Sequence, residues 1–316
     1  MRASIPVDLF NPGQVFACMG FMEAADVLLG DAECGFDWSD EANVRFLLSA
    51  RGEENPFAAV LRFLAEADVR RCAPNGYIDP ASKKKKSAED DGDDEVVAVQ
   101  LPDLSETFPS SKGDRMALPI RLEVNQRPSI CLSHWADGSS RDDFKLYAGN
   151  RSAASIARAM LRGTREKPKK KQDVGDLKTK GIDALWRDQS ADLTTKPFDV
   201  LTLIGGSFNF DPRGAWTALD AGYSPDRQKK AGNLGGILAS PVVEFLAALG
   251  LEHARPDEDA RRQVRYGAWR GLLPAILARP ALSGAVVGAP VKTFRFTFAG
   301  TKHNKVVTFA QEETNT

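Results

Sequence analysis

The chain has 316 residues, of which 42% are hydrophobic and 27% charged, and its formal net charge is -1. This length predicts about two domains with a sizeable core. The near-neutral balance argues against a protein that coats nucleic acid indiscriminately. The opening residues lack the apolar stretch of a secretion signal, and no uncharged apolar run approaches the ~20 residues of a membrane span. We therefore expect a cytoplasmic protein with no membrane partner.

Metal-binding and disulfide patterns are also missing from the sequence. The four cysteines are widely spaced and form no C-x-x-C pair: Cys18, Cys34, Cys72 and Cys131. The three histidines have no partner at helical spacing: His134, His253 and His303. The sequence therefore predicts reduced thiols, no metal site and no cofactor.

Three helices begin with the same signal, which is a capping side chain followed by proline at the first helical position. The three starts are Asn11-Pro12, Asn55-Pro56 and Ser240-Pro241. In the first helix Gln14 stands three residues after the cap, as in a capping box. This helix is expected to run to Gly30, and its polar face is little more than Glu23 and Asp26. A helix that is apolar nearly all round should be buried between other elements.

The first half of the chain predicts the order strand, helix, strand, strand, helix. The expected elements are a strand at 5–9, the helix from Pro12, strands at 34–38 and 44–49, and a helix at 56–67. A fourth strand is expected at 96–100 or near Val69. This order is typical of ferredoxin-like or RRM-like folds. We therefore predict an α+β protein with a ferredoxin-like/RRM-like N-terminal half and a mixed, β-rich C-terminal half.

Two polar segments interrupt the predicted helices and strands, and they suggest how the chain divides into domains. Residues 80–95 are charged and low in complexity, and we interpret them as an insertion in a first domain at 1–110. A second domain at 111–316 carries a basic loop at 165–181. Its expected strands lie at 120–124, 129–134 and 144–147, followed by a helix at 152–162 and a buried strand at 200–204. Residues 292–299 and 305–310 flank Gly300 and predict a β-hairpin.

Cations interleaved with aromatic rings favour contact with nucleic acid, because cations neutralise phosphates and rings stack on unpaired bases. The richest stretch, 207–230, also contains Phe208, Phe210 and Tyr223, and a second group carries Tyr266 and Trp269. The predicted nucleic-acid-binding residues are Lys169, Lys170, Lys171, Arg213, Trp216, Arg227, Lys229, Lys230, Arg265 and Arg270. The alternatives are that Phe208, Phe210 and Trp216 belong to the core and that the arginines near Tyr266 are ordinary surface residues. We expect Arg213 at the surface, since charged residues are seldom buried unpaired.

Catalytic interpretations have weaker support in the sequence. His134 beside Trp135 suits general acid-base cleavage of RNA, although an ordinary histidine at a strand end fits the same pattern. Asp211 and Asp220 suit an acid-base pair, but Asp211 stands before Pro212 and also suits a turn. The glycine-rich stretch 232–236 lacks the P-loop lysine and the dinucleotide spacing. We therefore predict a protein that is not an enzyme.

Three segments resemble a known family. They are Asn11 to Gly20 (NPGQVFACMG) with Glu23 to Asp26, then Phe210 to Asp220 (FDPRGAWTALD) running into Gly222 to Pro225, and finally Pro241 to Pro256. They resemble a small subunit family that takes the large-subunit position of the CRISPR type I-U, or I-G, Cascade effector complex. The resemblance touches both ends of the chain and leaves residues 70–195 without a recognisable motif.

The resemblance implies a non-catalytic subunit of an antiviral, guide-RNA-bound effector that finds double-stranded DNA beside a short protospacer-adjacent motif. Its implied partners are the CRISPR guide RNA, target double-stranded DNA, other Cascade subunits and the helicase-nuclease that degrades the target. Two alternatives stay open. One is a metal-independent endoribonuclease that processes guide RNA through His134, and the other is a repeat-associated RNA-binding backbone subunit. A scaffold that touches only protein is a further possibility.

Overall fold

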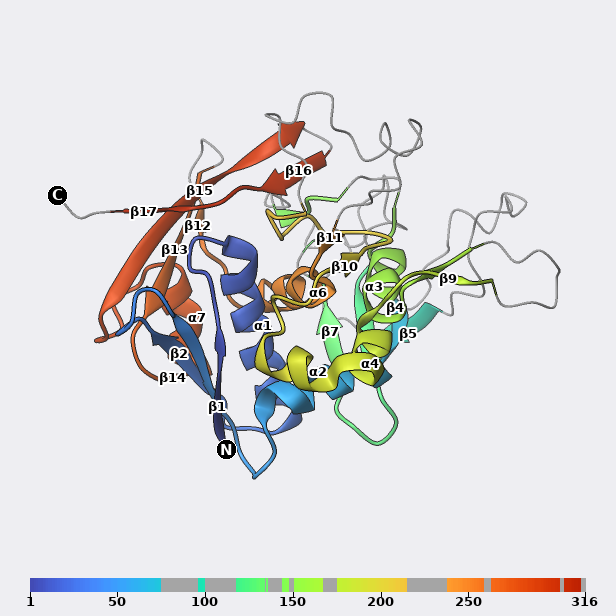
Figure 1. Cartoon of the computed structure of the whole chain (residues 1–316), viewed down its shortest axis with the longest axis horizontal. Helices are drawn as coiled ribbons and strands as arrows, with labels where there is room; N and C mark the ends of the chain where they lie inside the picture. Colours follow the sequence, from blue (N-terminus) through green and yellow to red (C-terminus); the bar gives the residue numbers. More distant parts are fainter. Residues whose placement is uncertain are drawn as a thin grey trace.

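The computed structural model describes residues 1–74, 96–99, 118–133, 135, 144–147, 151–166, 175–214, 238–258, 263–301 and 304–313. In this part of the chain the fold is a mixed α+β arrangement of helices and small, mainly antiparallel sheets (Figure 1). Helices α1 and α6 lie in the middle of the molecule, with strands on either side of them (Figure 1). The α+β class predicted from the sequence is therefore confirmed.

The first sheet is built mainly from the N-terminal residues. Its strands are β1 (Arg2–Pro6), β2 (Glu33–Asp37), β3 (Arg45–Ser49) and β14 (Leu273–Pro274). They lie in the order β1-β3-β2-β14, and every neighbouring pair is antiparallel. Strands β1 and β2 are therefore parallel to each other, with β3 between them and helix α1 connecting them. The register sets Phe46 opposite both Ile5 and Phe36, and all three side chains are buried.

The three helix starts predicted from cap and proline are confirmed. These helices are α1 (Pro12–Leu28), α2 (Pro56–Glu66) and α6 (Pro241–Gly250). The side chain of Asn11 accepts the N–H of Gln14, and Ser240 accepts the N–H of Val243. The capping box at Gln14 is wrong in one respect, because its Oε1 accepts the N–H of Asp8 at 2.8 Å rather than that of Asn11.

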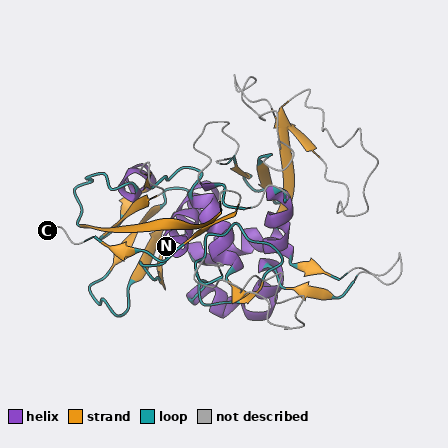
Figure 2. Ribbon diagram, turned by 90° about the horizontal axis from the view of Figure 1, so that it is seen from above, coloured by secondary structure: helices purple, strands orange, loops and turns teal. Residues whose placement is uncertain are grey.

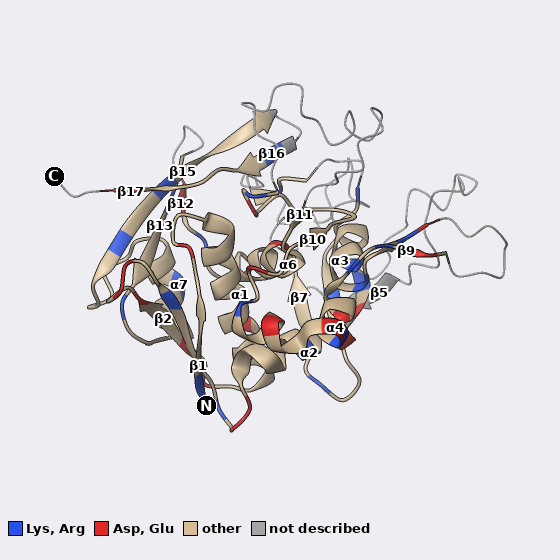
Figure 3. Ribbon diagram, viewed as in Figure 1, with Lys and Arg blue, Asp and Glu red and all other residues tan. Residues whose placement is uncertain are grey.

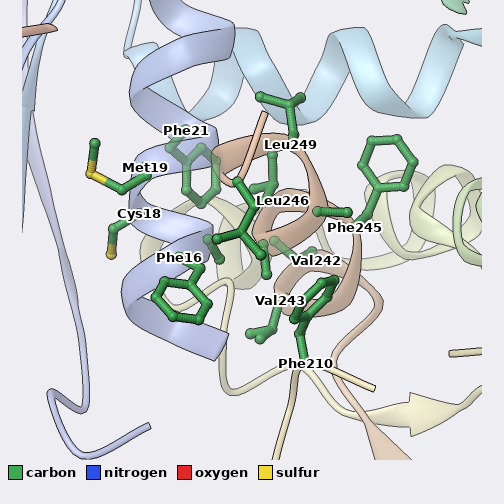
Figure 4. Close-up of a cluster of buried hydrophobic side chains, with 14 of the residues drawn as sticks. Phe16, Cys18, Met19, Phe21, Phe210, Val242, Val243, Phe245, Leu246 and Leu249 are labelled. Carbon is green, nitrogen blue, oxygen red and sulfur yellow. The ribbon is translucent and has the colours of Figure 1, made fainter. Parts of the chain in front are cut away.

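Helices α1 and α6 pack unusually closely, and their contact forms the centre of the core (Figure 4). Residues 12–25 of α1 and all of α6 are buried, as the sequence predicts for α1. The close approach depends on glycine. A Cβ added at Gly20 would lie 2.0 Å from the carbonyl oxygen of Leu246, and one at Gly250 would lie 2.1 Å from that of Phe16. Only residues without a side chain allow the two backbones to touch in this way.

The second sheet contains both of the stretches that the sequence predicts as alternatives for the fourth strand. Its strands are β5 (Val96–Val99), β4 (Asp68–Pro74), β6 (Ile120–Glu123) and β7 (Ile130–Leu132), in that order. Strands β4 and β5 are parallel, and the other pairs are antiparallel. Helix α3 (Ala153–Arg162) contacts β4 of this sheet, and helix α4 (Ile182–Thr195) packs against α3 and α2. The short strands β8 (Thr164–Arg165) and β9 (Leu177–Thr179) pair with each other. Arg162 on α3 binds the last carbonyls of α2, including Glu66 at 2.9 Å and Ala67 at 2.8 Å.

The third sheet closes the other side of the molecule. Its path is β12 (Asp257–Glu258), β13 (Gln263–Trp269), β15 (Val291–Thr301) and β16 (Asn304–Val307), and β17 (Gln311–Glu312) also pairs with β15. The antiparallel β15–β16 pairing confirms the predicted hairpin. The inner face carries Tyr266, whose hydroxyl donates to the carbonyl of Leu9 at 2.7 Å. Trp269 likewise donates its indole N–H to the carbonyl of Cys34 at 2.9 Å. The third sheet is thus bonded directly to the N-terminal segments.

Two predicted strands are wrong. Residues 144–147 form no strand, although Phe144, Leu146 and Tyr147 are buried. The buried strand expected at 200–204 is only the short strand β10 (Thr202–Leu203), which pairs with β11 (Leu238–Ala239) and leaves Leu201 and Leu203 exposed. In both places the apolar run indicates that the residues are buried or that they form a strand, but it does not determine which of the two occurs.

One continuous core joins the two halves of the sequence. It extends from Ile5 to Ala310 and crosses residue 110, the boundary predicted between the two domains. Figure 2, seen from above, shows helices between the strands of the third sheet and those on the opposite side. Charged positions are scattered over outer strands and over α3 and α4 (Figure 3). Among the described residues, every helix is too short or too polar to cross a membrane.

Candidate nucleic-acid interface

Residues 207–214, which we call the junction segment, pass over the N-terminal ends of α1 and α6. Phe208 and Phe210 are each only 1% exposed, so for these two rings the core interpretation is confirmed. Phe208 stacks on Trp135, with ring centroids 5.7 Å apart. Phe210 lies beside Val243 (Figure 4), and its carbonyl oxygen would be 2.3 Å from a Cβ on Gly13. The junction segment is therefore packed tightly against both central helices.

The carboxylate of Asp211 joins the two helix caps. Its side chain is fully buried; Oδ1 accepts the amide of Asn11 at 3.3 Å, and Oδ2 accepts the N–H of Ser240 at 3.4 Å. Helix N-termini favour an anion, because their free N–H groups and dipoles point toward it. The carbonyl of Asp211 also accepts the N–H of Gly214 at 3.1 Å, which confirms the predicted turn.

A second buried carboxylate, Glu244, holds the backbone of the junction segment. It lies in the first turn of α6, only 1% exposed, and accepts the N–H groups of Phe208 and Asp211 at 2.8 Å each. The pKa of Glu244 is raised to about 7, mainly by burial and in part by the carboxylate of Asp211, although hydrogen bonds from Asp211, Ser207 and Phe210 oppose the shift. Two acidic groups therefore lie side by side in the core.

Arg213 supplies positive charge to this acidic pair. Its Nε lies 2.9 Å from Oδ1 of Asp211, and its Nη2 lies 2.7 Å from Oδ2, so the contact is bidentate. The Arg213 side chain remains 23% exposed, whereas that of Asp211 is 0% exposed. The structure thus places Arg213 near the surface, as expected, but as the ion-pair partner of a buried acid.

Asp211, in the junction segment, binds residues on both sides of the basic and aromatic stretch at 215–237. Asp211 binds Arg213, which precedes residues 215–237, and Ser240, which follows them. Four predicted binding residues fall inside that stretch and outside the described residues: Trp216, Arg227, Lys229 and Lys230. Lys169, Lys170 and Lys171 also lie outside the described residues. The described residues on either side of that stretch, Arg213 and Ser240, are both held at the α1–α6 junction.

The last two predicted arginines lie at the third sheet, in β13 and at its end. Arg265 is exposed and pairs with Glu313 at 2.7 Å, and it stands opposite Arg295 in the neighbouring strand. Arg270 is exposed at the end of β13, where its N–H donates to the carbonyl of Pro290 at 2.9 Å. Tyr266 and Trp269 between them point into the core. The structure therefore separates these arginines from their aromatic neighbours and does not bring them to the junction segment.

Residues considered for catalysis or metal binding are only partly described. His253 is exposed, whereas His134, His303 and Asp220 lie outside the described residues. Within the described ranges no group of three His, Cys, Asp or Glu side chains is arranged to hold a metal ion. Burial raises the pKa of the thiols of Cys18 and Cys34 well above the usual value. These two cysteines are therefore unreactive core residues.

The acidic side of the junction does not follow from the sequence predictions. They do not include Glu244, although it is the only charged residue in the stretch PVVEFLAALG. A lone acid in an otherwise apolar helix is the signal that could have found it, because an unpaired charge is too costly to bury. Comparison with known family models, curated proteins and solved structures finds nothing similar to this chain.

Proposed function

We propose that the chain is a non-catalytic subunit of a CRISPR type I Cascade effector complex that contacts guide RNA and target DNA. In this role it reads the short flanking motif, contacts other Cascade subunits and helps to recruit the helicase-nuclease. The supporting observation is that the described parts of the three segments with family resemblance, which are far apart in sequence, pack against one another. Helix α1, the junction segment and α6 meet at Asn11, Asp211 and Ser240.

This convergence is relevant because the resemblance is carried by separate short motifs. Chance similarity gives no reason for the motifs to touch, whereas a shared fold requires the motif residues to make each other's contacts. Asn11 and Asp211 are 200 residues apart in sequence, yet their side chains are hydrogen bonded. Glu244, in the third segment, accepts the backbone N–H of Asp211, in the second segment, at 2.8 Å. The motifs are thus structurally interdependent, which supports a common origin.

The composition of the basic stretch supports contact with nucleic acid. Residues 215–230 contain Trp216, Tyr223, Arg227, Lys229 and Lys230, and only Asp220 and Asp226 oppose these cations. Rings and cations together suit single-stranded or distorted nucleic acid. Arg213, which precedes this stretch in the junction segment, is held by its ion pair with Asp211.

We also retain the RRM-like interpretation of the N-terminal half as a proposal. Its support is the unit β1-α1-β2 with β3 between the two parallel strands, which is the first half of the ferredoxin-like order. The second half differs, since β4 and β5 pair in another sheet and β14 occupies the edge beside β2. An RRM-like sheet would suit a repeat-associated RNA-binding subunit as well as the large-subunit position.

Reconstitution with the products of neighbouring genes tests the proposed function. The chain is co-expressed with them and with a guide RNA, purified through a tag on another subunit, and compared with a preparation that lacks the chain. We expect the chain to co-purify with RNA, and target DNA binding to depend on both the chain and the flanking motif. Equal target binding without the chain would contradict the proposal.

The same preparation separates the rival functions. The purified chain is incubated with repeat RNA in EDTA, where a metal-independent endoribonuclease still cleaves and a non-catalytic subunit does not. A protein-only scaffold predicts co-purification without salt-sensitive binding of RNA or DNA. Each outcome therefore identifies a different function.

A further inference from the structure

Two phenylalanines from opposite ends of the chain are half-exposed and lie on backbone segments that are hydrogen bonded to each other. Phe10 is 47% exposed and Phe309 is 51% exposed, and among the described residues these are the only aromatic side chains classed as exposed. The N–H of Ala310 donates to the carbonyl of Phe10 at 2.8 Å, so the two backbones are neighbours. An exposed aromatic ring offers a flat apolar face to a ligand, and these two rings come from adjacent backbone segments.

The backbone on both sides prevents either ring from turning inward. Leu9 and Asn11, on either side of Phe10, are buried, and so is Ala310 beside Phe309. The N–H of Phe10 donates to Oδ1 of Asp8 at 2.9 Å. The ring of Phe10 also rests edge-on against buried Phe294, with centroids 5.4 Å apart and planes at 87°. Phe10 is therefore fixed with one side toward the core and the rest toward solvent.

The same two stretches are bonded to the junction segment. The N–H of Val307, two residues before Phe309, donates to the carbonyl of Asn209 at 3.2 Å. Asn11, next to Phe10, binds Asp211, and Asp211 binds Arg213. The backbone segments that carry the two rings are thus both bonded to the segment that carries Arg213. Aromatic faces suit an unpaired nucleobase, and a guanidinium suits a phosphate.

A second exposed apolar surface provides a contrast. Helix α7 (Ala275–Leu282) and the loop after it expose Ile276 by 74% and Val286 by 98%. The one charged residue of this stretch, Arg279, is bound by buried Glu23 through two contacts of 2.7 Å. This surface is aliphatic and offers neither a ring nor a free cation. It therefore supplies control positions for the aromatic pair.

We propose that Phe10 and Phe309 form a stacking site for unpaired nucleobases of the displaced DNA strand. This inference rests on the proposed function and deepens it, because it assigns base contact to residues outside the segments predicted to bind phosphate. The rings contribute affinity for bases of any sequence, whereas Arg213 and the lysine-rich segments contribute affinity for the backbone. Sequence itself is read by pairing with the guide.

The test compares the purified full chain on two probes, a short single-stranded DNA and an abasic strand of equal length that keeps the phosphates. We expect tighter binding of the normal strand. Phe309→Leu and Phe10→Leu should each reduce this preference at least about fivefold and leave affinity for the abasic strand unchanged, since stacking contributes ~1–3 kcal/mol per base. Val286→Ala is the matched control and should change neither affinity. Phe309→Leu is the safer variant, because it retains apolar bulk at a half-exposed position.

The possible failures are distinct from one another. If both leucine variants keep the wild-type preference for bases, the stacking site is contradicted while nucleic-acid contact by the chain stands. If the wild-type chain binds neither probe in a salt-sensitive way, the proposed function fails as well. If the variants bind both probes normally but no longer co-purify with the other subunits, the rings are a protein-docking surface and the inference is wrong.

Discussion

Arg213 binds Asp211 through two parallel contacts, Nε to Oδ1 at 2.9 Å and Nη2 to Oδ2 at 2.7 Å. This is the paired geometry in which a guanidinium binds a carboxylate most strongly. Asp211 is fully buried and also accepts hydrogen bonds from both helix caps. Arg213 therefore compensates a charge on which the α1–α6 junction depends, in addition to any contact that it makes outside the protein.

Replacing Arg213 with alanine should destabilise the fold. Removing one partner of a fully buried ion pair costs ~3–5 kcal/mol. Arg213 is 23% exposed and Asp211 keeps its backbone and Asn11 donors, so we expect a smaller loss of about 1–3 kcal/mol in the free energy of unfolding. Chemical denaturation measures the change. Arg265→Ala is the control, because its pair with Glu313 is exposed and should contribute less than about 1 kcal/mol. Equal stability of R213A and the wild type would contradict this role.

The contact between α1 and α6 predicts a severe effect at Gly20. A Cβ there would lie 2.0 Å from the carbonyl oxygen of Leu246, and the obstacle is backbone that cannot rotate away. Overpacking usually costs ~1–3 kcal/mol, so Gly20→Ala should reach or exceed about 3 kcal/mol and lower the melting temperature strongly. Gly52→Ala is the comparison, since Gly52 has open space but a φ of +91°. It should lose only the ~1–2 kcal/mol of a left-handed residue. Similar losses for both variants would argue against a close helix contact.

The parts of the fold that sequence predicts correctly are those fixed by neighbouring residues. Asn11, Asn55 and Ser240 each accept an N–H within three residues, so cap and proline identify three helices without tertiary information. Strand pairing is different, because it depends on distant partners. The stretch near Val69 is indeed a strand, yet it pairs with β6 and β5 instead of joining β1. Its own residues do not indicate which sheet it joins.

The candidate site is less predictable for the same reason. By residue type alone, Phe208 and Phe210 fit a core or a binding loop equally well. Contacts with distant residues, such as those of Phe208 with Glu244 and Trp135, place them in the core. Asn11 was predicted as a cap, and nothing near it in sequence indicates its bond to Asp211. The exposed pair Phe10 and Phe309 exists only because both ends of the chain meet at Ala310. Such contacts are properties of the fold and not of any local pattern.

The lysine cluster at 169–171 allows a test of phosphate contact that needs no structural detail. Replacing all three lysines with glutamate should weaken DNA binding for every sequence alike, because phosphate contacts carry no base information. The slope of log affinity against log salt should decrease by about one per lost contact. Replacing Lys84, Lys85 and Lys86 is the control, since six acidic residues follow them within the next nine positions and cancel their charge. An unchanged slope for the 169–171 variant would exclude this cluster from binding.

The last prediction concerns Glu244, whose pKa is raised to about 7, mainly by burial and further by the nearby carboxylate of Asp211. Because the unfolded chain releases this proton near the usual pH of about 4.3, the native state binds more protons between that pH and 7. Stability should therefore be greatest at low pH within this window and fall by on the order of 1–3 kcal/mol as pH rises to 8. Glu244→Gln removes the titration, so its stability should change less over the same range, whereas Glu53→Gln at an exposed site should follow the wild type. Denaturation at pH 5, 6, 7 and 8 measures the slopes, and parallel curves for E244Q and the wild type would show that Glu244 does not titrate there.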